Sequence, residues 1–121
     1  MPGREEAVVL TQVPEIDREA ELLRTLAHPV RLALLEALSQ GEECVCHLTA
    51  LLERPQPYIS KQLAELREAG LVADRRDAQR IYYRLADDRI GVLLEAARAL
   101  SGRQVAPGQQ VVAGCACPRC S

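Results

Sequence analysis

The segment from Gln56 to Leu85 limits most strongly what this chain can fold into. In its first half, Ile59, Leu63 and Leu66 recur at helical spacing, so one face of a helix there is apolar and the opposite face is polar. Gly70 follows where helices often end on a left-handed residue, and we expect the helix to end there. This half of the segment therefore predicts one short amphipathic helix.

Two short extended runs follow this helix, at residues 71–73 and 80–85, and a polar turn at Asp77 and Ala78 separates them. A short helix with small polar side chains outward, followed by an arginine-containing hairpin, is typical of a winged helix-turn-helix. In that fold the helix enters the DNA major groove and the hairpin lies along the DNA backbone. The segment therefore predicts a DNA-binding unit.

Apolar residues at helical spacing also predict helices over residues 15–26, 30–38, 42–52 and 87–100. His28-Pro29 separates the first two, because the residue before a proline avoids the helical conformation and proline suits a first helical turn. At this junction we expect the histidine to have a structural role rather than to bind metal. The helix at 42–52 would support the DNA-reading helix.

Length and composition fit a mostly α fold with a two-stranded β wing. At 121 residues the chain can bury one core, and 48% hydrophobic residues without Phe or Trp leave Leu, Ala, Val and Ile to fill it. We divide the chain into an N-terminal lead (1–14), the winged helix-turn-helix domain (15–101) and a flexible cysteine-rich tail (102–121). No run of membrane-spanning length and no signal-peptide pattern is visible, so we expect a cytoplasmic protein without a membrane partner.

The charge distribution favours DNA as a partner although the net charge is −2. Residues 1–53 hold four Lys/Arg and ten Asp/Glu, residues 54–84 hold seven and four, and residues 85–121 hold four and three. Basic charge is thus concentrated in the segment whose pattern predicts DNA binding, as contact with phosphates requires.

Three motifs are similar to those of a known family: LAHPVRL at residues 26–32, ECVCHL at 43–48 and QPYISKQLAELREAGLV at 56–72. Over about residues 16–100 the chain resembles the ArsR/SmtB family of metal-responsive transcriptional repressors. The resemblance implies a homodimer whose first and last helices form the interface. It also implies binding to double-stranded operator DNA without metal, and release when metal binds. No nucleophile–base set, phosphate loop or cofactor motif is visible, so we expect neither an enzyme nor an organic substrate.

The sequence departs from the family pattern at several positions. Many members have a histidine where Gln62 stands. Arsenic-type members often carry Cys-Val-Cys-Asp-Leu-Cys where this chain has Cys-Val-Cys-His-Leu-Thr, so Thr49 replaces the third thiol. Residues 87–100 contain Asp87 and Asp88 but no histidine, so we expect the zinc-type site of the last helix to be absent.

Cys44 and Cys46, here called the thiol pair, lie just before the DNA-reading helix. On a regular helix they would point about 200° apart, too far to bind one ion together. At the start of a helix, where the backbone can stay extended, side chains two residues apart share a face and can converge. Joint ligation would then distort the helix at 42–52, whereas two buried side chains without function are the alternative. For His47 we expect a solvent-facing position, with nitrogen ligation as the alternative.

Three further thiols form a tail cluster: Cys115, Cys117 and Cys120. The chain from Ser101 to this cluster spans roughly 45 Å when extended, so the cluster can approach the thiol pair of either subunit. Soft thiolates favour soft ions: arsenite or antimonite would take three sulfurs, and cadmium, lead or zinc three or four. The tail cluster could act alone or together with the thiol pair.

The side chains predicted to face DNA are Tyr58, Ser60, Lys61, Gln62 and Arg67 on the helix, and Arg75, Arg76 and Arg80 on the hairpin. Ser60 and Gln62 can donate or accept hydrogen bonds at base edges, whereas Lys61 and Arg67 are expected on phosphates. The hairpin arginines should act through their charge. For any one of these residues the alternative is an ordinary solvated side chain.

Three functions are compatible with these patterns. The first is a homodimeric repressor that senses a thiophilic inducer, arsenite or antimonite above all, or cadmium or lead. The second keeps the DNA binding but makes the cysteines a redox or persulfide switch. The third is a small thiol metal buffer without specific DNA binding. They differ in whether metal ions, oxidants or neither release the operator.

Overall fold

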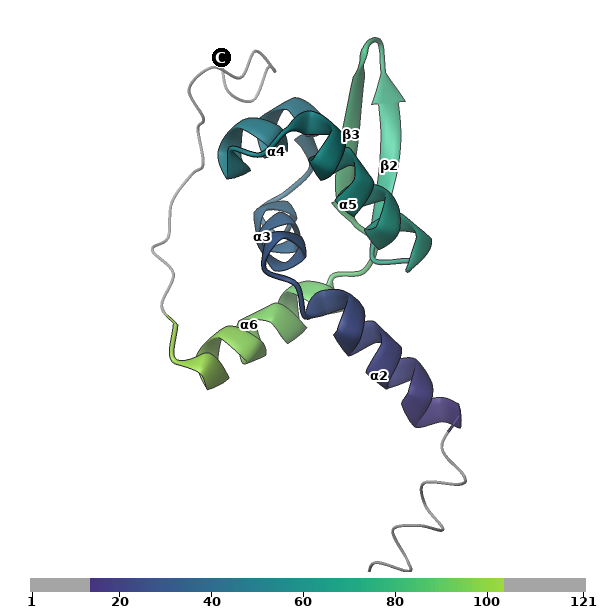
Figure 1. The fold of residues 1–121 in the computed structure, drawn as a ribbon, viewed down its shortest axis with the longest axis vertical. Helices are drawn as coiled ribbons and strands as arrows, with labels where there is room; N and C mark the ends of the chain where they lie inside the picture. The colour runs from purple at the N-terminus through teal and green to yellow at the C-terminus, as the bar shows by residue number, and fades with distance from the viewer. Residues whose placement is uncertain (1–13, 104–121) are drawn as a thin grey trace, which may run out of the picture.

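A computed structural model describes residues 14–103 of the chain. Its helices are α2 (Pro14–Leu26), α3 (Pro29–Leu38), α4 (Val45–Leu52), α5 (Gln56–Glu68) and α6 (Arg89–Ser101), and its strands are β1 (Glu43–Cys44), β2 (Val72–Asp77) and β3 (Arg80–Leu85). The mostly helical fold with a β wing confirms the predicted winged helix-turn-helix (Figure 1). Within this range, no helix combines the length and apolar character needed to cross a membrane.

The core lies where α3, α4 and α5 meet. The fully buried side chains of its hydrophobic cluster are aliphatic: Leu34 and Leu35 of α3, Leu48 of α4, and Ile59, Leu63 and Leu66 of α5. Burying one side chain of this size contributes about 1.5–3 kcal/mol, so Leu and Ile can hold the helices together without Phe or Trp. The expected aliphatic core is confirmed.

Local sequence explains where the helices begin and end. His28 is extended, and its Nδ1 accepts a hydrogen bond from the backbone N–H of Arg31 at 3.4 Å, so it caps α3 while Pro29 occupies the first turn. The structural role predicted for this histidine is confirmed. Gly70 has a φ of +80° just after the C-cap of α5, which is the left-handed residue that the pattern required.

The hairpin is longer than predicted, and a third strand joins it. β2 extends to Asp77, beyond the predicted run at 71–73, and turns into β3 through Ala78 and Gln79. β1 pairs antiparallel with the other edge of β3, with Cys44 opposite Tyr82, so the strand order is β1-β3-β2. Most of β2 is charged and exposed, so apolar residues predict only the start of this strand.

The helix predicted over residues 42–52 is wrong at its start. Glu43 and Cys44 form β1, and α4 begins only at Val45. The backbone of Cys44 is extended (φ −80°, ψ 157°), and its Sγ accepts the N–H of His47 at 3.2 Å as the cap of α4. The extended form satisfies backbone groups by pairing them with β3, a partner that lies almost forty residues further along the chain.

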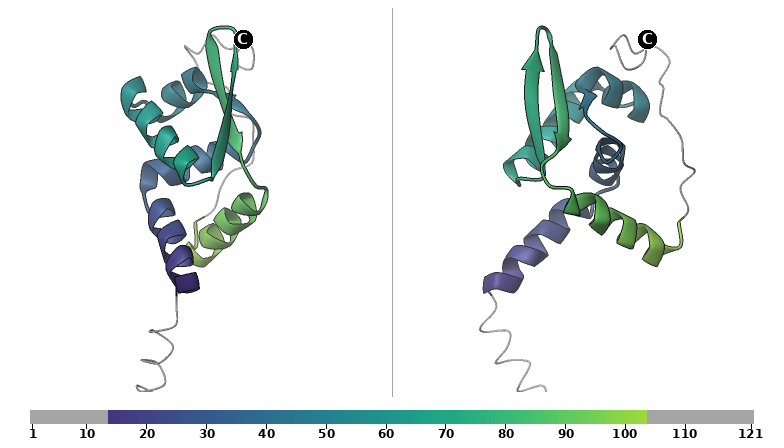
Figure 2. Two further views of the ribbon diagram at one scale, coloured as in Figure 1. Left: turned by 90° about the vertical axis from the view of Figure 1, so that its right-hand side faces the viewer. Right: turned by 180° about the vertical axis from the view of Figure 1, so that it is seen from behind.

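The fold separates two ends of the molecule. In Figures 1 and 2 the wing tip, α4 and α5 lie towards one end, whereas α2 and α6 reach towards the other. Large apolar side chains are exposed on α2 and α6: Ile16, Leu23, Val92 and Leu100. The predicted DNA-facing elements are therefore well removed from this apolar surface.

Candidate DNA-binding face and thiol site

Helix α5, the recognition helix, turns part of its predicted DNA face to solvent. Lys61 and Arg67 are exposed and Ser60 is partly exposed. Arg67 also pairs with Asp74 of β2 at 3.0 Å, so its positive charge is partly neutralised by a carboxylate of the wing. Tyr58 is half-buried and packs against the core. Fewer side chains of this helix are thus available for contact with DNA than were predicted.

Gln62 lies on the buried face of α5, so the exposed position that a base-reading residue needs is not observed. The residue is 5% exposed, and its Oε1 accepts a hydrogen bond from Nε of Arg31 at 2.8 Å. The same guanidinium pairs with Glu65 and donates to the carbonyl of Thr25 at 3.3 Å. Arg31 therefore joins the end of α2, the start of α3 and the recognition helix. Residue type alone suggested exposure for Gln62, and its partner lies 31 residues earlier.

Arg75 is exposed on the wing but is hydrogen-bonded to Glu42, which lies two residues before Cys44. Its Nε and Nη2 donate to the carboxylate of Glu42 at 2.9 and 2.7 Å, and its guanidinium lies 4.6 Å from the centroid of the Tyr82 ring. The hydrogen bond from this guanidinium lowers the pKa of Glu42 below its ordinary value. Arg76, next along β2, is exposed. A charged contact that the sequence patterns did not reveal thus links the residue before β1 to the wing.

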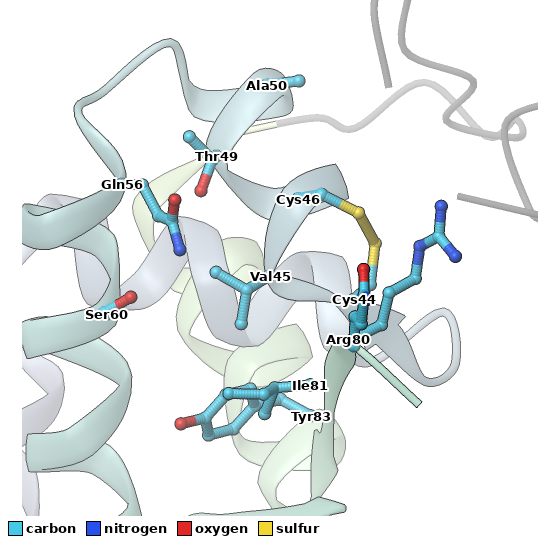
Figure 3. A pocket seen from close by; sticks show the side chains of 11 residues that line it. Cys44, Val45, Cys46, Thr49, Ala50, Gln56, Ser60, Arg80, Ile81 and Tyr83 are labelled. Atoms are coloured by element: carbon cyan, nitrogen blue, oxygen red, sulfur yellow. A yellow bond between two sulfur atoms is a disulfide. The ribbon is translucent and has the colours of Figure 1, made fainter. Parts of the chain in front are cut away.

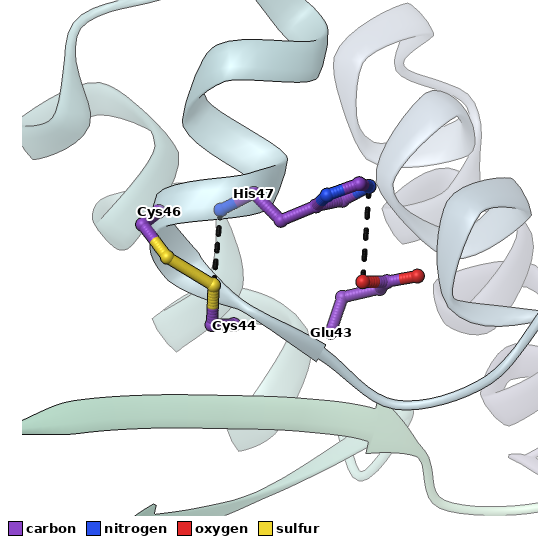
Figure 4. The surroundings of a disulfide bond; sticks show 4 residues. All are labelled: Glu43, Cys44, Cys46 and His47. Atoms are coloured by element: carbon purple, nitrogen blue, oxygen red, sulfur yellow. Dashed lines mark hydrogen bonds and ion pairs between the residues drawn. A yellow bond between two sulfur atoms is a disulfide. The ribbon is translucent and has the colours of Figure 1, made fainter. Parts of the chain in front are cut away.

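The thiol pair comes together, as predicted for an extended helix start. Cys44 and Cys46 are joined by a disulfide, with their Cα atoms 5.3 Å apart (Figure 4). The two residues differ in exposure, since Cys44 is 1% exposed and Cys46 is exposed. Both sulfurs lie where β1 passes into α4, which packs against α5.

His47 is buried, so the expected solvent-facing position is wrong. It is 0% exposed, and its Nε2 lies 3.7 Å from Oε1 of Glu43, which is itself 2% exposed. Charged residues are rarely buried this fully unless they are paired. In Figure 4 the imidazole points away from the two sulfurs, so nitrogen ligation beside them does not fit this arrangement.

The tail cluster lies outside the described residues. Between residues 14 and 103, no group of three or more His, Cys, Asp or Glu side chains could hold a metal ion. The thiol pair supplies the soft donors that a thiophilic ion prefers, but only two of them. A site of three sulfurs would need another ligand from the tail or from a second subunit.

A cavity of about 530 Å³ lies beside the thiol pair, between α4, α5 and β3 (Figure 3). Ser60 and Gln56 of the recognition helix line one side, and Arg80 of β3 rises alongside the disulfide. Two of the predicted DNA-facing residues therefore share a cavity with both sulfurs. Gln56 belongs to this site but was not among the predicted residues, because it stands at the very start of the helix.

Comparisons with known proteins agree with this architecture. The family model described as "Bacterial regulatory protein, arsR family" matches residues 28–74. The chain is 53% identical over 81 residues to the biofilm growth-associated repressor of Agrobacterium fabrum, covering 67% of this chain and 69% of that protein. It is 58% identical over 55 residues to the arsenic resistance transcriptional regulator ArsR1 of Pseudomonas putida, and this match covers 46% of this chain and 42% of that protein. A solution structure of a homodimeric winged helix-turn-helix DNA-binding domain from Mycobacterium bovis superposes with a TM-score of 0.66 at 27% identity, covering 78% of this chain and 88% of that one.

Proposed function

Since this chain belongs to the ArsR family of bacterial transcriptional repressors, we propose that a thiophilic inducer controls its binding to operator DNA at Cys44 and Cys46. Arsenite or antimonite is the first candidate, because the chain is 58% identical over 55 residues to an arsenic resistance transcriptional regulator. One observation carries this proposal: both sulfurs meet at the start of α4, against the two elements predicted to hold DNA.

The thiol pair has two connections to the DNA-facing elements. Through α4 it packs against the recognition helix, and through β1 it is paired with β3 of the wing. Cys44 takes part in both, because its sulfur caps α4 while its backbone lies opposite Tyr82. Drawing both sulfurs towards one ion would alter the cap and the strand edge together. The recognition helix and the wing would then lose the spacing that operator DNA requires.

The tail cluster is the proposed source of the remaining sulfur. Three thiolates suit arsenite and antimonite, and a fourth would suit cadmium, lead or zinc. Lys61, Arg76 and Arg80 are proposed to contact phosphates, with Ser60 at the base edges. The exposed apolar residues of α2 and α6 are the proposed homodimer interface, and the cytoplasm is the expected compartment.

A redox switch at the same cysteines is the second candidate, and the disulfide is the observation that favours it. An oxidant such as peroxide, a disulfide or a polysulfide would take two electrons from the thiol pair and leave Cys44 bonded to Cys46. The same two mechanical connections would carry this signal to DNA.

Fluorescence anisotropy on DNA from the region upstream of the gene tests both candidates. The reduced protein is titrated with arsenite, antimonite, cadmium, lead, zinc and peroxide, beside two full-length variants, C44S/C46S and C115S/C117S/C120S. We expect arsenite to release the parent protein and to fail with C44S/C46S. Loss of response only in the tail variant would overturn the role of the thiol pair. Absence of any specific operator binding would instead favour the thiol buffer.

A further inference from the structure

The geometry beside the disulfide points to a small-molecule site: we infer that the 530 Å³ cavity binds a small anionic thiol, or its disulfide, which exchanges with Cys46. This deepens the proposed function and rests on the proposed role of the thiol pair. The lining of the cavity indicates which class of compound would oxidise or reduce that pair, whichever inducer acts on it.

The size and charge of the cavity select the ligand class. Its volume falls within the range of about 300–1,000 Å³ that is typical of small-molecule sites. Arg80 supplies a cationic group, and Gln56 and Ser60 supply an amide and a hydroxyl. None of the described residues that line the cavity is acidic, so none of them would repel an anion. Val45 and Ile81 add apolar surface for a short carbon chain.

The two sulfurs are not equivalent, and their difference decides which one is attacked. Cys46 is exposed at the edge of the cavity, whereas Cys44 is buried and capped by the N–H of His47 at 3.2 Å. An incoming thiolate therefore reaches Cys46. The leaving sulfur is Cys44, and the same N–H is in place to donate to the thiolate that forms there.

The exchange balances as two thiol–disulfide steps. The thiolate RS⁻ attacks Sγ of Cys46, a bond forms between the two sulfurs, and the bond to Cys44 breaks with its electron pair left on Cys44. A second RS⁻ attacks the sulfur of the bound RS group, which releases RSSR and leaves Cys46 as a thiolate. The protein disulfide gains two electrons, and two small thiols are oxidised to one disulfide. In reverse, RSSR oxidises the thiol pair through the same mixed disulfide.

The position of the cavity gives the adduct a second effect. Its walls include Gln56 and Ser60 of the recognition helix and Arg80 of the wing. An RS group attached to Cys46 would lie between the two elements predicted to bind DNA (Figure 3). The mixed disulfide and operator DNA should therefore compete for this side of the molecule.

Three thiols of similar size but different charge test the selection by charge. The full-length C115S/C117S/C120S variant, oxidised at the thiol pair, is reduced with 3-mercaptopropionate, 2-mercaptoethanol or cysteamine, quenched with an alkylating reagent and analysed by intact mass. Each rate is compared with that of the same protein carrying Arg80→Gln, Arg80→Lys or, as the matched wing control, Arg76→Gln. Because each comparison uses one thiol, the intrinsic reactivity of that thiol cancels.

We expect Arg80→Gln to slow 3-mercaptopropionate about threefold to fivefold, to leave 2-mercaptoethanol unchanged and to speed cysteamine. Arg80→Lys should retain the parent preference, and Arg76→Gln should change the three rates little. Equal changes for all three thiols, or the same pattern with Arg76→Gln, would overturn the assignment of Arg80 and the cavity.

Single-cysteine proteins test which sulfur reacts. In the same tail-substituted background, Cys44→Ser leaves Cys46 and Cys46→Ser leaves Cys44, and each is treated with 3,3′-dithiodipropionate. We expect the adduct on Cys46 to form at least about tenfold faster and to weaken operator binding. Equal rates, or full operator binding by the adduct, would overturn the inference. The exchange rates are measured without DNA, so the predicted rates can be observed even if arsenite and peroxide fail to release the operator. Conversely, if the predicted rates are not observed, release of the operator by arsenite or peroxide would still support the proposed function.

Discussion

Nε of Arg31 donates to Oε1 of Gln62 across 2.8 Å, which joins the start of α3 to the buried side of the recognition helix. The same guanidinium reaches Glu65, one turn nearer the C-terminal end of α5, and the carbonyl of Thr25 near the end of α2. One side chain thus fixes the recognition helix relative to the helix that is proposed to dimerise. The orientation of α5 depends on a buried polar contact as well as on apolar packing.

Arg31→Ala should lower the free energy of unfolding by about 1–3 kcal/mol, because the amide of Gln62 is left buried without this partner. Urea denaturation measures the change. Arg24→Ala is the control, since the pair of Arg24 with Glu21 is largely exposed and should be worth at most about 0.5 kcal/mol. An Arg31→Ala protein as stable as the control would contradict the proposal that Arg31 fixes the position of α5.

Lys61→Ala and Gln62→Ala should have opposite effects although the residues are neighbours. Lys61 is exposed, so its loss should leave stability within about 0.5 kcal/mol of the parent and reduce the slope of log K against log salt by about 1. Gln62 is buried, so its loss should lower stability and leave that slope unchanged. Operator titrations at several salt concentrations, beside urea denaturation, distinguish the two. A reduced salt slope for Gln62→Ala would restore it as a DNA contact.

The pair of Glu42 with Arg75 should stabilise the fold in a pH-dependent way. Hydrogen bonding to Arg75 lowers the pKa of Glu42 from about 4.5, so its contribution is complete above the unfolded pKa and is lost as pH falls through the lower folded value. The midpoint of thermal unfolding of Glu42→Gln should therefore lie below that of the parent at pH 7. This difference in midpoint should vanish in acid.

Asp87→Asn is the comparison for this pH series. The hydrogen bond from Arg89 lowers the pKa of Asp87 from 3.8 to about 2, so the difference between this variant and the parent should persist to lower pH than that of Glu42→Gln. If both differences disappear over the same pH range, the assignment of the Glu42 effect to Arg75 fails.

Cys44→Ser and Cys44→Ala should separate the cap of α4 from the chemistry of the sulfur. Serine is a preferred N-cap residue and can still accept the N–H of His47, whereas alanine cannot, so the alanine variant should be less stable by about 1 kcal/mol. Both variants should lose the response to arsenite. Denaturation under reducing conditions gives the stabilities, and a serine variant that still responds would remove Cys44 from the sensor.

Val92→Asp should weaken the homodimer, because it places a charge on the exposed apolar surface of α6. Sedimentation velocity should show a shift towards monomer, and operator affinity should fall because two linked half-sites are no longer bound together. Arg76→Ala on the wing should leave the assembly state unchanged. A dimeric Val92→Asp protein would move the interface away from this part of α6.

Local signals in the sequence determined the elements and one feature of the site. Helical spacing placed the recognition helix, Gly70 marked its end, and Pro29 marked the start of α3. These signals work because they involve neighbours within one or two turns. The convergence of Cys44 and Cys46 followed in the same way, from the geometry of an extended helix start.

Only the tertiary structure decided how the polar residues are used. Gln62 is buried because Arg31 reaches it from another helix, and Cys44 lies in a strand because β3 offers its backbone a partner. The cavity that joins Arg80 to the thiol pair likewise requires α4, α5 and β3 together. Each contact links residues about thirty or more positions apart, whose proximity depends on how the whole chain packs and not on the pattern around either one.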